Sequence, residues 1–526
     1  MTRKFIDDDF VIVRRDRSAS ADARRTLCFG DEVELLDDHQ PDDDWLPVIV
    51  LNWGDGDEFG FVKATTRLRD EPVMRVSMVD VQQGDGMVIE TPGGQIVFVD
   101  AGDNQMFARH VAARFRHRHP TPDDPLDVAA IIVTHGDADH FDGLNDLRRS
   151  ESLPSRKAHK RVPIRPRRIF SNGLVKAPTT VPDADRLGRS IDHDGRRYAV
   201  DLFDDPREAG EAAMSQPFKH FATSLDHWET RGPIEFRRVD ASMDPDDVFG
   251  FLSGDGIDVD IFGPFVEQVP DPANGADMAA LRWFPAPSKT PEIHLERGGA
   301  GEGSPSLSHT INGHSIGLRL TYKNVRFVLT GDMNTESMRM LRDRVDTAVL
   351  EGEFVKAPHH GSHEFDLEAL RSTRPVVAAV SSGDDNAFVE YIHPRATLMA
   401  ALGQSMRGDT GLLFSTELTA FFRYRDDCYT RDDLADYFAA RPDQQFTGDE
   451  LRKLFSGVPR EEDPPGQFKG FERTNFGIIH VRTDGERVLV FTHSGRRGLN
   501  EAYRFRVTVD QASGERHVEF ETVTTS

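Results

Sequence analysis

Hydrophobic and polar residues alternate in short runs along residues 1–70. Runs such as DFVIVRR and LPVIVLN are separated by turns rich in Gly and Asp, such as NWGDGDEFG. Short alternating runs with turns of this kind are typical of strands in an all-β unit. We therefore expect a small β-barrel here, which either binds a partner or packs as an extension on the rest of the chain.

From residue 74 the pattern changes to that of a mixed unit. Residues 74–148 alternate strand, hairpin, strand, helix and strand, with PGG at 92–94 as the hairpin turn and NQMFARHVAARFRHR as the helix. This order predicts the α/β class, and the turn residues suit a tight hairpin. Residues 150–310 are less regular and predict an insertion, within which GIDVDIFGPF (256–265) has the pattern of a core strand.

The strand pattern returns after the insertion. Residues 312–333 predict strand, turn and strand, TESMRMLRDR (335–344) predicts a helix, and VVAAVSSG (376–383) predicts a buried strand. We assign residues 74–415 to the main domain. Residues 416–526 are expected to form an extension, with strands near its end, that either completes this domain or is appended to it.

Composition narrows the class of protein. The 64 basic and 89 acidic residues give a net charge of −25, and the excess Asp is scattered as on a solvated surface. This charge argues against a broad nucleic-acid-binding face, which needs clustered Lys and Arg. The two cysteines, Cys28 and Cys428, exclude a disulfide framework. The polar, acidic start and the lack of an apolar run of ~18–20 residues predict a cytoplasmic enzyme without a membrane segment.

Four candidate metal ligands lie within six residues in the segment IIVTHGDADHFDGL (131–144). His135, Asp137, Asp139 and His140 directly follow an apolar, β-branched run. Imidazole and carboxylate together suit Zn²⁺ and Mn²⁺, and a loop at the end of a strand can direct several side chains to one point. The alternative is a solvated acidic turn with two incidental histidines.

The spacing H-x-D-x-D-H resembles the H-x-H-x-D-H motif of the metallo-β-lactamase fold. The Asp at position 137 resembles one branch in particular, the soluble hydrolase domain of ComEC-type DNA-uptake proteins. Four more segments resemble motifs of that branch in the same order, namely VSMVDVQQGDGMVIETPGGQIVFVDAGD (76–103), residues 312–333, VLEGEFVKAPHHGSHEF (349–365) and YIHP (391–394). The resemblance implies an αββα sandwich over roughly residues 74–415. Residues 1–70 are similar to bacterial SH3-like domains.

The resemblance also implies a ligand set for two divalent ions, Zn²⁺ or Mn²⁺. The expected metal ligands are His135, Asp137, Asp139, His140, Asp332, His360 and His314. Asp332, in FVLTGDM, would bridge the ions, although a helix N-cap is an alternative role. His309 and Asn312 are alternatives to His314, and His359 is an alternative to His360. More oxygen ligands than usual would favour Mn²⁺.

Other residues are expected to act around the ions. Asp139, His359 and His393 are the candidate catalytic residues, and a simple His-Pro turn is the alternative for His393. Asp100, in IVFVDAGD, is expected to orient a ligating histidine. Asp85, in QQGDG, is interpreted as a turn residue that supports the site loop.

A basic segment, SRKAHKRVPIRPRR (155–168), stands out in this acidic chain. It contains seven basic residues and no acid: Arg156, Lys157, Lys160, Arg161, Arg165, Arg167 and Arg168. We expect it to line an electropositive groove that leads DNA to the metals. The alternative is a solvated loop paired with neighbouring acids.

These features predict a metal-dependent phosphodiesterase, in first place a DNA nuclease that uses a metal-bound hydroxide in anti-phage defence or DNA processing. One alternative is a hydrolase of small phosphodiesters, such as a nucleotide or a phosphocholine ester. Another is an inactive scaffold whose β-barrel binds a protein partner. Lactam hydrolysis is disfavoured because the second histidine of the usual motif is absent.

Overall fold

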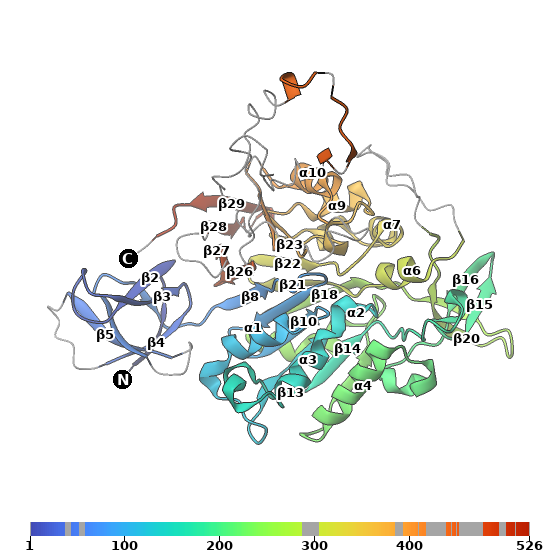
Figure 1. Cartoon of the computed structure of the whole chain (residues 1–526), viewed down its shortest axis with the longest axis horizontal. Helices are drawn as coiled ribbons and strands as arrows, with labels where there is room; N and C mark the ends of the chain where they lie inside the picture. Colours follow the sequence, from blue (N-terminus) through green and yellow to red (C-terminus); the bar gives the residue numbers. More distant parts are fainter. Residues whose placement is uncertain are drawn as a thin grey trace.

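The computed structural model describes residues 2–36, 44–51, 58–286, 304–383, 393–408, 410–416, 438–442, 444–448, 450–451, 477–493, 501–510 and 512–524. Two large sheets pack face to face, and a smaller all-β region lies at one end of them (Figure 1). Within these ranges, none of the helices combines the length and apolar character that crossing a bilayer would require.

The first sheet contains ten strands among the described residues. In order they are β17 (Glu235–Arg238), β14 (Arg168–Ser171), β12 (Ala130–Ile132), β10 (Ile96–Ala101), β9 (Gly86–Glu90), β8 (Met74–Met78), β26 (Ile478–Thr483), β27 (Arg487–His493), β28 (Ala502–Val509) and β29 (Arg516–Glu521). Strands β10, β12, β14 and β17 are parallel, and the others pair antiparallel. The C-terminal strands therefore extend the sheet that begins with β8. The turn predicted at 92–94 joins β9 to β10 and is confirmed.

The second sheet contains six strands in the described part of the chain. In order they are β18 (Ile257–Gly263), β21 (Gly317–Tyr322), β22 (Val325–Leu329), β23 (Phe354–Lys356), β24 (Val377–Val380) and β25 (Leu412–Ser415). One apolar core joins the two sheets, with Val76 and Met87 from the first and Leu320 and Phe327 from the second. Burial of these faces removes apolar area from water and stabilises the sandwich.

Helices cover both outer faces. Helices α1 (Met106–Arg114), α3 (Gly143–Ser150) and α4 (Gln216–Glu229) share a core with the first sheet. Helices α7 (Thr335–Arg344), α9 (Leu367–Thr373) and α10 (Ala396–Ser405) share one with the second. The layers are therefore αββα (Figure 1). Strand β10 is buried along its whole length because helices cover one face and the second sheet covers the other.

The insertion adds a small sheet at the far end of the sandwich. Strands β15 (Ser190–His193), β16 (Arg196–Ala199), β20 (Asp277–Arg282) and β19 (Glu267–Pro270) form a small antiparallel sheet. In Figure 1 this sheet lies on the opposite side of the molecule from the N-terminus.

The N-terminal β-region (residues 2–69) forms a separate seven-stranded sheet among its described residues. In order its strands are β3 (Ala23–Cys28), β2 (Phe10–Arg14), β6 (Glu58–Lys63), β5 (Trp45–Val50), β4 (Glu32–Leu35), β1 (Thr2–Ile6) and β7 (Leu68–Arg69). It is fastened to the C-terminal strands by buried ion pairs, in which Arg482 lies 2.8 Å from Asp31 and Arg504 lies 3.1 Å from Asp9. The N-terminal β-region is thus packed on the main domain.

Candidate metal centre

The candidate metal residues lie where the loops of both sheets meet at one edge. His135 and His140 follow β12, Asp332 follows β22, and His360 follows β23. Strand β12 runs parallel to β10, and β22 runs parallel to β23. In parallel sheets, the loops at the carboxyl ends of the strands gather at one edge and form binding sites.

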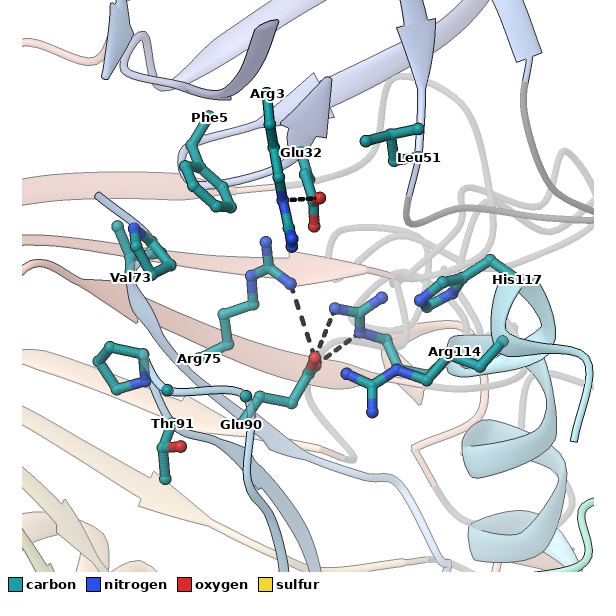
Figure 2. A pocket seen from close by; sticks show the side chains of 15 residues that line it. Arg3, Phe5, Glu32, Leu51, Val73, Arg75, Glu90, Thr91, Arg114 and His117 are labelled. Atoms are coloured by element: carbon teal, nitrogen blue, oxygen red, sulfur yellow. Dashed lines mark hydrogen bonds and ion pairs between the residues drawn. The ribbon is translucent and has the colours of Figure 1, made fainter. Parts of the chain in front are cut away.

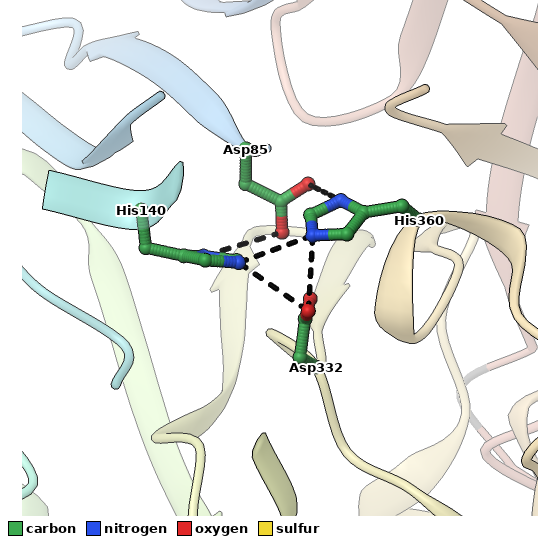
Figure 3. Close-up of side chains that lie close together, drawn as sticks. All are labelled: Asp85, His140, Asp332 and His360. Atoms are coloured by element: carbon green, nitrogen blue, oxygen red, sulfur yellow. Dashed lines mark hydrogen bonds and ion pairs between the residues drawn. The ribbon is translucent and has the colours of Figure 1, made fainter. Parts of the chain in front are cut away.

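Four buried side chains converge at this edge. Asp85, His140, Asp332 and His360 each offer one ligand atom, and these atoms all lie within 4.8 Å of one another. Nε2 of His360 lies 2.9 Å from Oδ2 of Asp332, and Nε2 of His140 lies 3.3 Å from the same oxygen. Figure 3 shows the four side chains pointing toward one another from different segments of the chain. We call them the central cluster.

Two glycines allow the loops to come this close. Gly84 precedes Asp85 with φ +106°, and a Cβ there would lie 1.8 Å from the carbonyl oxygen of Asp139. Gly331 precedes Asp332 with φ +51°, and a Cβ there would lie 2.7 Å from Cβ of Ser315. Any other residue would be strained or would clash at both positions. The sequences QQGD and TGD are therefore required by the local geometry.

Burial and mutual contacts perturb the ionisation of the cluster. Burial lowers the pKa of His140, but Asp332 and Asp100 outweigh this effect and raise the pKa well above its ordinary value. Asp332 and Asp85 outweigh burial in the same way and raise the pKa of His360 to about 10. Burial and the nearby His140 hold the pKa of His135 well below its ordinary value. Protons on His140 and His360 thus balance the negative charge of the buried carboxylates, and a bound cation would displace these protons.

The donor set fits a divalent metal. Two imidazoles and two carboxylates are the ligand types of Zn²⁺ and Mn²⁺ sites. Beside them, Nε2 of His135 is buried and has no hydrogen-bond partner among the described residues. Its ring centroid is only 3.9 Å from that of His140. A buried nitrogen without a hydrogen-bond partner lowers the stability of the folded protein. A metal bound here would give Nε2 of His135 a partner.

Comparison with known proteins agrees with this geometry. Residues 79–381, more than half of the chain, match the family model of the metallo-beta-lactamase superfamily. The chain belongs to this superfamily. One similar solved structure is Igni18, described as a novel metallo hydrolase from the hyperthermophilic archaeon Ignicoccus hospitalis KIN4/I. It has 12% sequence identity and a TM-score of 0.23, over 64% of this chain and 95% of that chain. Comparison with curated proteins gave no match.

Membership of the metallo-β-lactamase superfamily supports a metal-dependent hydrolase.

Asp100 positions His140 from the side of the ring that faces away from the cluster. Its Oδ2 accepts hydrogen bonds from Nδ1 of His140 at 2.8 Å and from the hydroxyl of Thr134 at 2.7 Å. Its Oδ1 accepts one from the backbone N–H of Thr134 at 2.8 Å. These bonds fix the ring so that Nε2 of His140 faces the cluster.

The two aspartates of the H-x-D-x-D-H motif lie at the rim. Oδ2 of Asp139 is 3.6 Å from Nε2 of His360 and accepts a hydrogen bond from Gln83 at 3.2 Å. Asp137 is not a member of the central cluster, and its Oδ1 lies 2.5 Å from Nζ of Lys176. The Lys176 side chain is 22% exposed, so it places a positive charge at the mouth of the site.

The structure distinguishes the three candidates for the remaining ligand. His314 was expected to bind metal, but its Nε2 donates to the carbonyl of Arg282 at 2.7 Å and its ring stacks on Phe284. His309 pairs with Glu336. Asn312 is the residue at the site: in its consistent amide orientation its oxygen accepts from Nε2 of His359 at 3.0 Å, and its nitrogen donates to Asp137 at 2.8 Å. His314, expected as a ligand, is therefore directed to another part of the protein, and Asn312 is the candidate that contacts the residues beside the cluster.

His359 and His393 lie beside the cluster. Nε2 of His359 is 3.8 Å from Oδ2 of Asp332, and its ring centroid is 6.0 Å from that of His393. Burial and the neighbouring His359 lower the pKa of His393 to about 3. Tyr391 and Ile392, the first residues of the YIHP motif, lie outside the described residues.

Sequence reasoning missed two members of the site. Asp85 was interpreted as a turn residue, yet it belongs to the central cluster. Lys356 was not singled out; it is buried, pairs with Asp85 and donates to the carbonyl of Gly331 at 2.6 Å. A lysine inside the apolar run before APHHGS was the available signal, because buried lysines are almost always paired.

The basic segment lies away from this site. Strand β14 pairs with β12 in parallel, with Ile169 opposite Ile131, so the residues before β14 lie at the amino ends of the strands, whereas His135 follows their carboxyl ends. Arg165 and Arg167 pair with Asp127, at 2.7 Å and 3.0 Å. The expected groove to the metals is therefore wrong for this segment.

The other members of the segment agree with this placement. Arg168 pairs with Glu235, and Arg161 donates to the carbonyl of Leu153 at 2.7 Å. Arg156, Lys157 and Lys160 belong to the 3₁₀ turn η2 (Ser155–Lys160), which has no buried residue. The segment thus combines the exposed turn η2 with strand β13 (Ile164–Pro166), and several of its arginines pair with acids or backbone carbonyls.

Proposed function

We propose that the chain is a metal-dependent phosphodiesterase. The observation that carries the proposal is the central cluster, with two carboxylates and two imidazoles within 4.8 Å and the free Nε2 of His135 beside them. The resemblance of the motifs to those of ComEC-type hydrolase domains supports a phosphodiester substrate. Asp137, in place of the usual histidine, argues against lactam hydrolysis.

Each part of the site has a role in this proposal. Asp85, His140, Asp332, His360 and His135 would hold one or two divalent ions, Zn²⁺ or Mn²⁺. When bound, such ions polarise phosphoryl oxygens and make a water ligand acidic enough to attack at neutral pH. Asp139, at the rim, accepts the proton of the attacking water. His359, whose Nε2 donates to Asn312, lies beside Asp332 where it would contact the substrate, and His393 lies next to it. The leaving oxygen takes its proton from solvent water.

DNA is the first substrate to test, and a small phosphodiester is the second. The DNA hypothesis depends on the resemblance to DNA-uptake proteins. A small substrate is favoured by the position of the basic segment at the other end of the strands and by the net charge of −25. Lys176, which pairs with Asp137, offers one ammonium group that can contact a single phosphate, whereas tracking a DNA backbone needs many cations.

We also propose a role for the N-terminal β-region, namely the binding of a protein partner. Its similarity to SH3-like domains suggests that residues 1–70 bind a protein partner beside the main domain at 74–415 and the extension at 416–526. Anti-phage defence or DNA processing in the cytoplasm is the setting that a nuclease would imply. An inactive scaffold is the competing interpretation.

The test combines two substrates and one variant. Purified protein is incubated with linear and circular DNA and with bis-(p-nitrophenyl) phosphate, in Mn²⁺, in Zn²⁺ and in EDTA. We expect metal-dependent turnover of the small diester, abolished in Asp332→Asn. Additional cleavage of DNA would identify a nuclease. Protein that folds but retains no metal and hydrolyses neither substrate would overturn the proposal and favour the scaffold.

A further inference from the structure

A cavity of about 560 Å³ lies at the junction between the N-terminal β-region and the main domain. Arg3, Phe5 and Glu32 line it from the β-region, and Arg75, Glu90 and Arg114 line it from the main domain (Figure 2). Its volume falls within the range of small-molecule sites. We call it the junction pocket.

The junction pocket is separate from the metal centre. Asp85 directly precedes strand β9, whereas Glu90 ends it. A strand rises about 3.4 Å per residue, so the backbone positions of Asp85 and Glu90 are separated by roughly 17 Å along β9. A ligand in the junction pocket would therefore contact neither the central cluster nor its rim.

Cations outnumber anions around the junction pocket. Four arginines line it, Arg3, Arg75, Arg114 and Arg118, against two glutamates, Glu32 and Glu90. Glu90 accepts from Arg114 at 2.6 Å and 2.7 Å and lies 3.6 Å from Arg75. Arg3 pairs with Glu32. Both carboxylates are therefore already engaged, and two positive charges are left in excess.

Arg118 is the arginine without such a partner. Its side chain makes no hydrogen bond or ion pair with a described residue, and its guanidinium lies 5.4 Å from the ring centroid of Phe115. Burial and Arg114 lower its pKa, an effect that Glu90 opposes. Nδ1 of the adjacent His117 is buried and has no hydrogen-bond partner among the described residues. The junction pocket thus contains a guanidinium group and a ring nitrogen that have no hydrogen-bond partner among the described residues.

Burial and the nearby arginines lower the pKa values of two residues that line the junction pocket. Burial and the neighbouring Arg114 lower the pKa of Arg75 to about 10. Burial, Arg114 and Arg118 lower the pKa of His117 to about 4, so its ring is neutral at pH 7. An anion with two charges would remove this repulsion, and planar guanidinium groups match phosphate oxygens in pairs.

We propose that the junction pocket binds a small phosphorylated anion that carries at least two negative charges. Arg118 and Arg3 contact its phosphate groups, and Arg75 and Arg114, held by Glu90, complete the positive surface. Because residues of both the β-region and the main domain line the pocket, the anion bridges the two parts of the protein and stabilises their junction.

Pyrophosphate is the probe, and calorimetric titration of the full-length protein is the measurement. We expect saturable binding of pyrophosphate to the wild type and a rise in its melting temperature. Arg118→Ala removes one charge-assisted contact and should weaken binding by about tenfold or more. Arg116→Ala, in the same turn but outside the pocket lining, is the matched control and should change affinity less than about twofold.

A second variant separates this site from the metal centre. Asp332→Asn disables the central cluster and should leave pyrophosphate binding unchanged. Binding that is lost in Asp332→Asn but kept in Arg118→Ala would place the anion at the metals and overturn the proposal. Equal weakening by Arg116→Ala and Arg118→Ala, or equally tight binding of citrate, would also overturn it.

Discussion

Lys356 forms a buried ion pair with Asp85, and its Nζ also lies 3.6 Å from Oδ1 of Asp332. Burial disfavours the charged ammonium, but Asp85 and Asp332 outweigh burial and raise the pKa of Lys356 above its ordinary value. The metal centre therefore has a permanent internal cation, which neutralises part of the carboxylate charge independently of any bound ion. Because Lys356 contacts both Asp85 and Asp332, it contributes to the stability of the fold and to the position of these two carboxylates.

Replacing Lys356 with Met should destabilise the protein. The variant leaves two buried carboxylates without their cation, and breaking a buried pair from one side costs about 3–5 kcal/mol. Urea unfolding with EDTA measures the change. Lys63→Met, on the exposed end of β6, is the control and should cost within about 0.5 kcal/mol.

A double-variant cycle tests the cause. If the ion pair accounts for the loss, Lys356→Met with Asp85→Asn should be less destabilised than the sum of the two single variants. Strict additivity would show that Lys356 stabilises the fold through packing alone.

The pattern along the chain was sufficient to predict the α/β class because the strands carry strong local signals, and the αββα sandwich followed from the resemblance of the motifs. The strand predicted at 256–265 and the helix predicted at 335–344 appear as β18 and α7. The pattern could not show that β26 pairs with β8, since a partner some four hundred positions away leaves no mark on either strand.

The site was predicted less completely, for reasons of tertiary geometry. Asp85 has the local appearance of a turn residue, and only the packing of Gly84 on Asp139 brings it to His360. Whether Asn312 or His314 reaches the site depends on where α6 (Leu307–Gly313) ends, because the end of the helix sets the direction of each side chain. The basic segment lay close in sequence to the motif, but the parallel pairing of β14 places it at the opposite end.

Removing the carboxylate of Asp85 should weaken metal binding. Asp85→Asn keeps the size of the side chain but removes one charged ligand, so we expect metal affinity to fall by about 100-fold or more. Elemental analysis after dialysis against a metal buffer gives the metal content. Asp103→Asn, an exposed change in the loop after β10, should keep the wild-type content. Full metal retention in Asp85→Asn would limit Asp85 to pairing with Lys356.

Charge reversal in the basic segment should not impair turnover. Arg156→Glu combined with Lys157→Glu lies at the amino ends of the parallel strands, so kcat/KM should stay within about twofold of the wild type. Lys176→Gln removes the cation at the mouth of the site and should raise KM about tenfold while the metal content is kept. The reverse result, with the double reversal harmful and Lys176→Gln silent, would show that substrate approaches along residues 155–168.

His314 should make the protein less stable in acid without contributing to metal binding. Burial lowers its pKa from 6.5 to about 4 in the folded protein, so the unfolded chain takes up a proton first as the pH falls. The contribution of neutral His314 is complete above pH 6.5 and is lost as the pH falls toward 4, by about 3 kcal/mol in total. In His314→Gln, whose amide can still donate to the carbonyl of Arg282, the free energy of unfolding should fall less steeply across this window, and metal content should match the wild type. An unchanged slope would contradict the burial of a neutral ring, and loss of metal would restore His314 as a ligand.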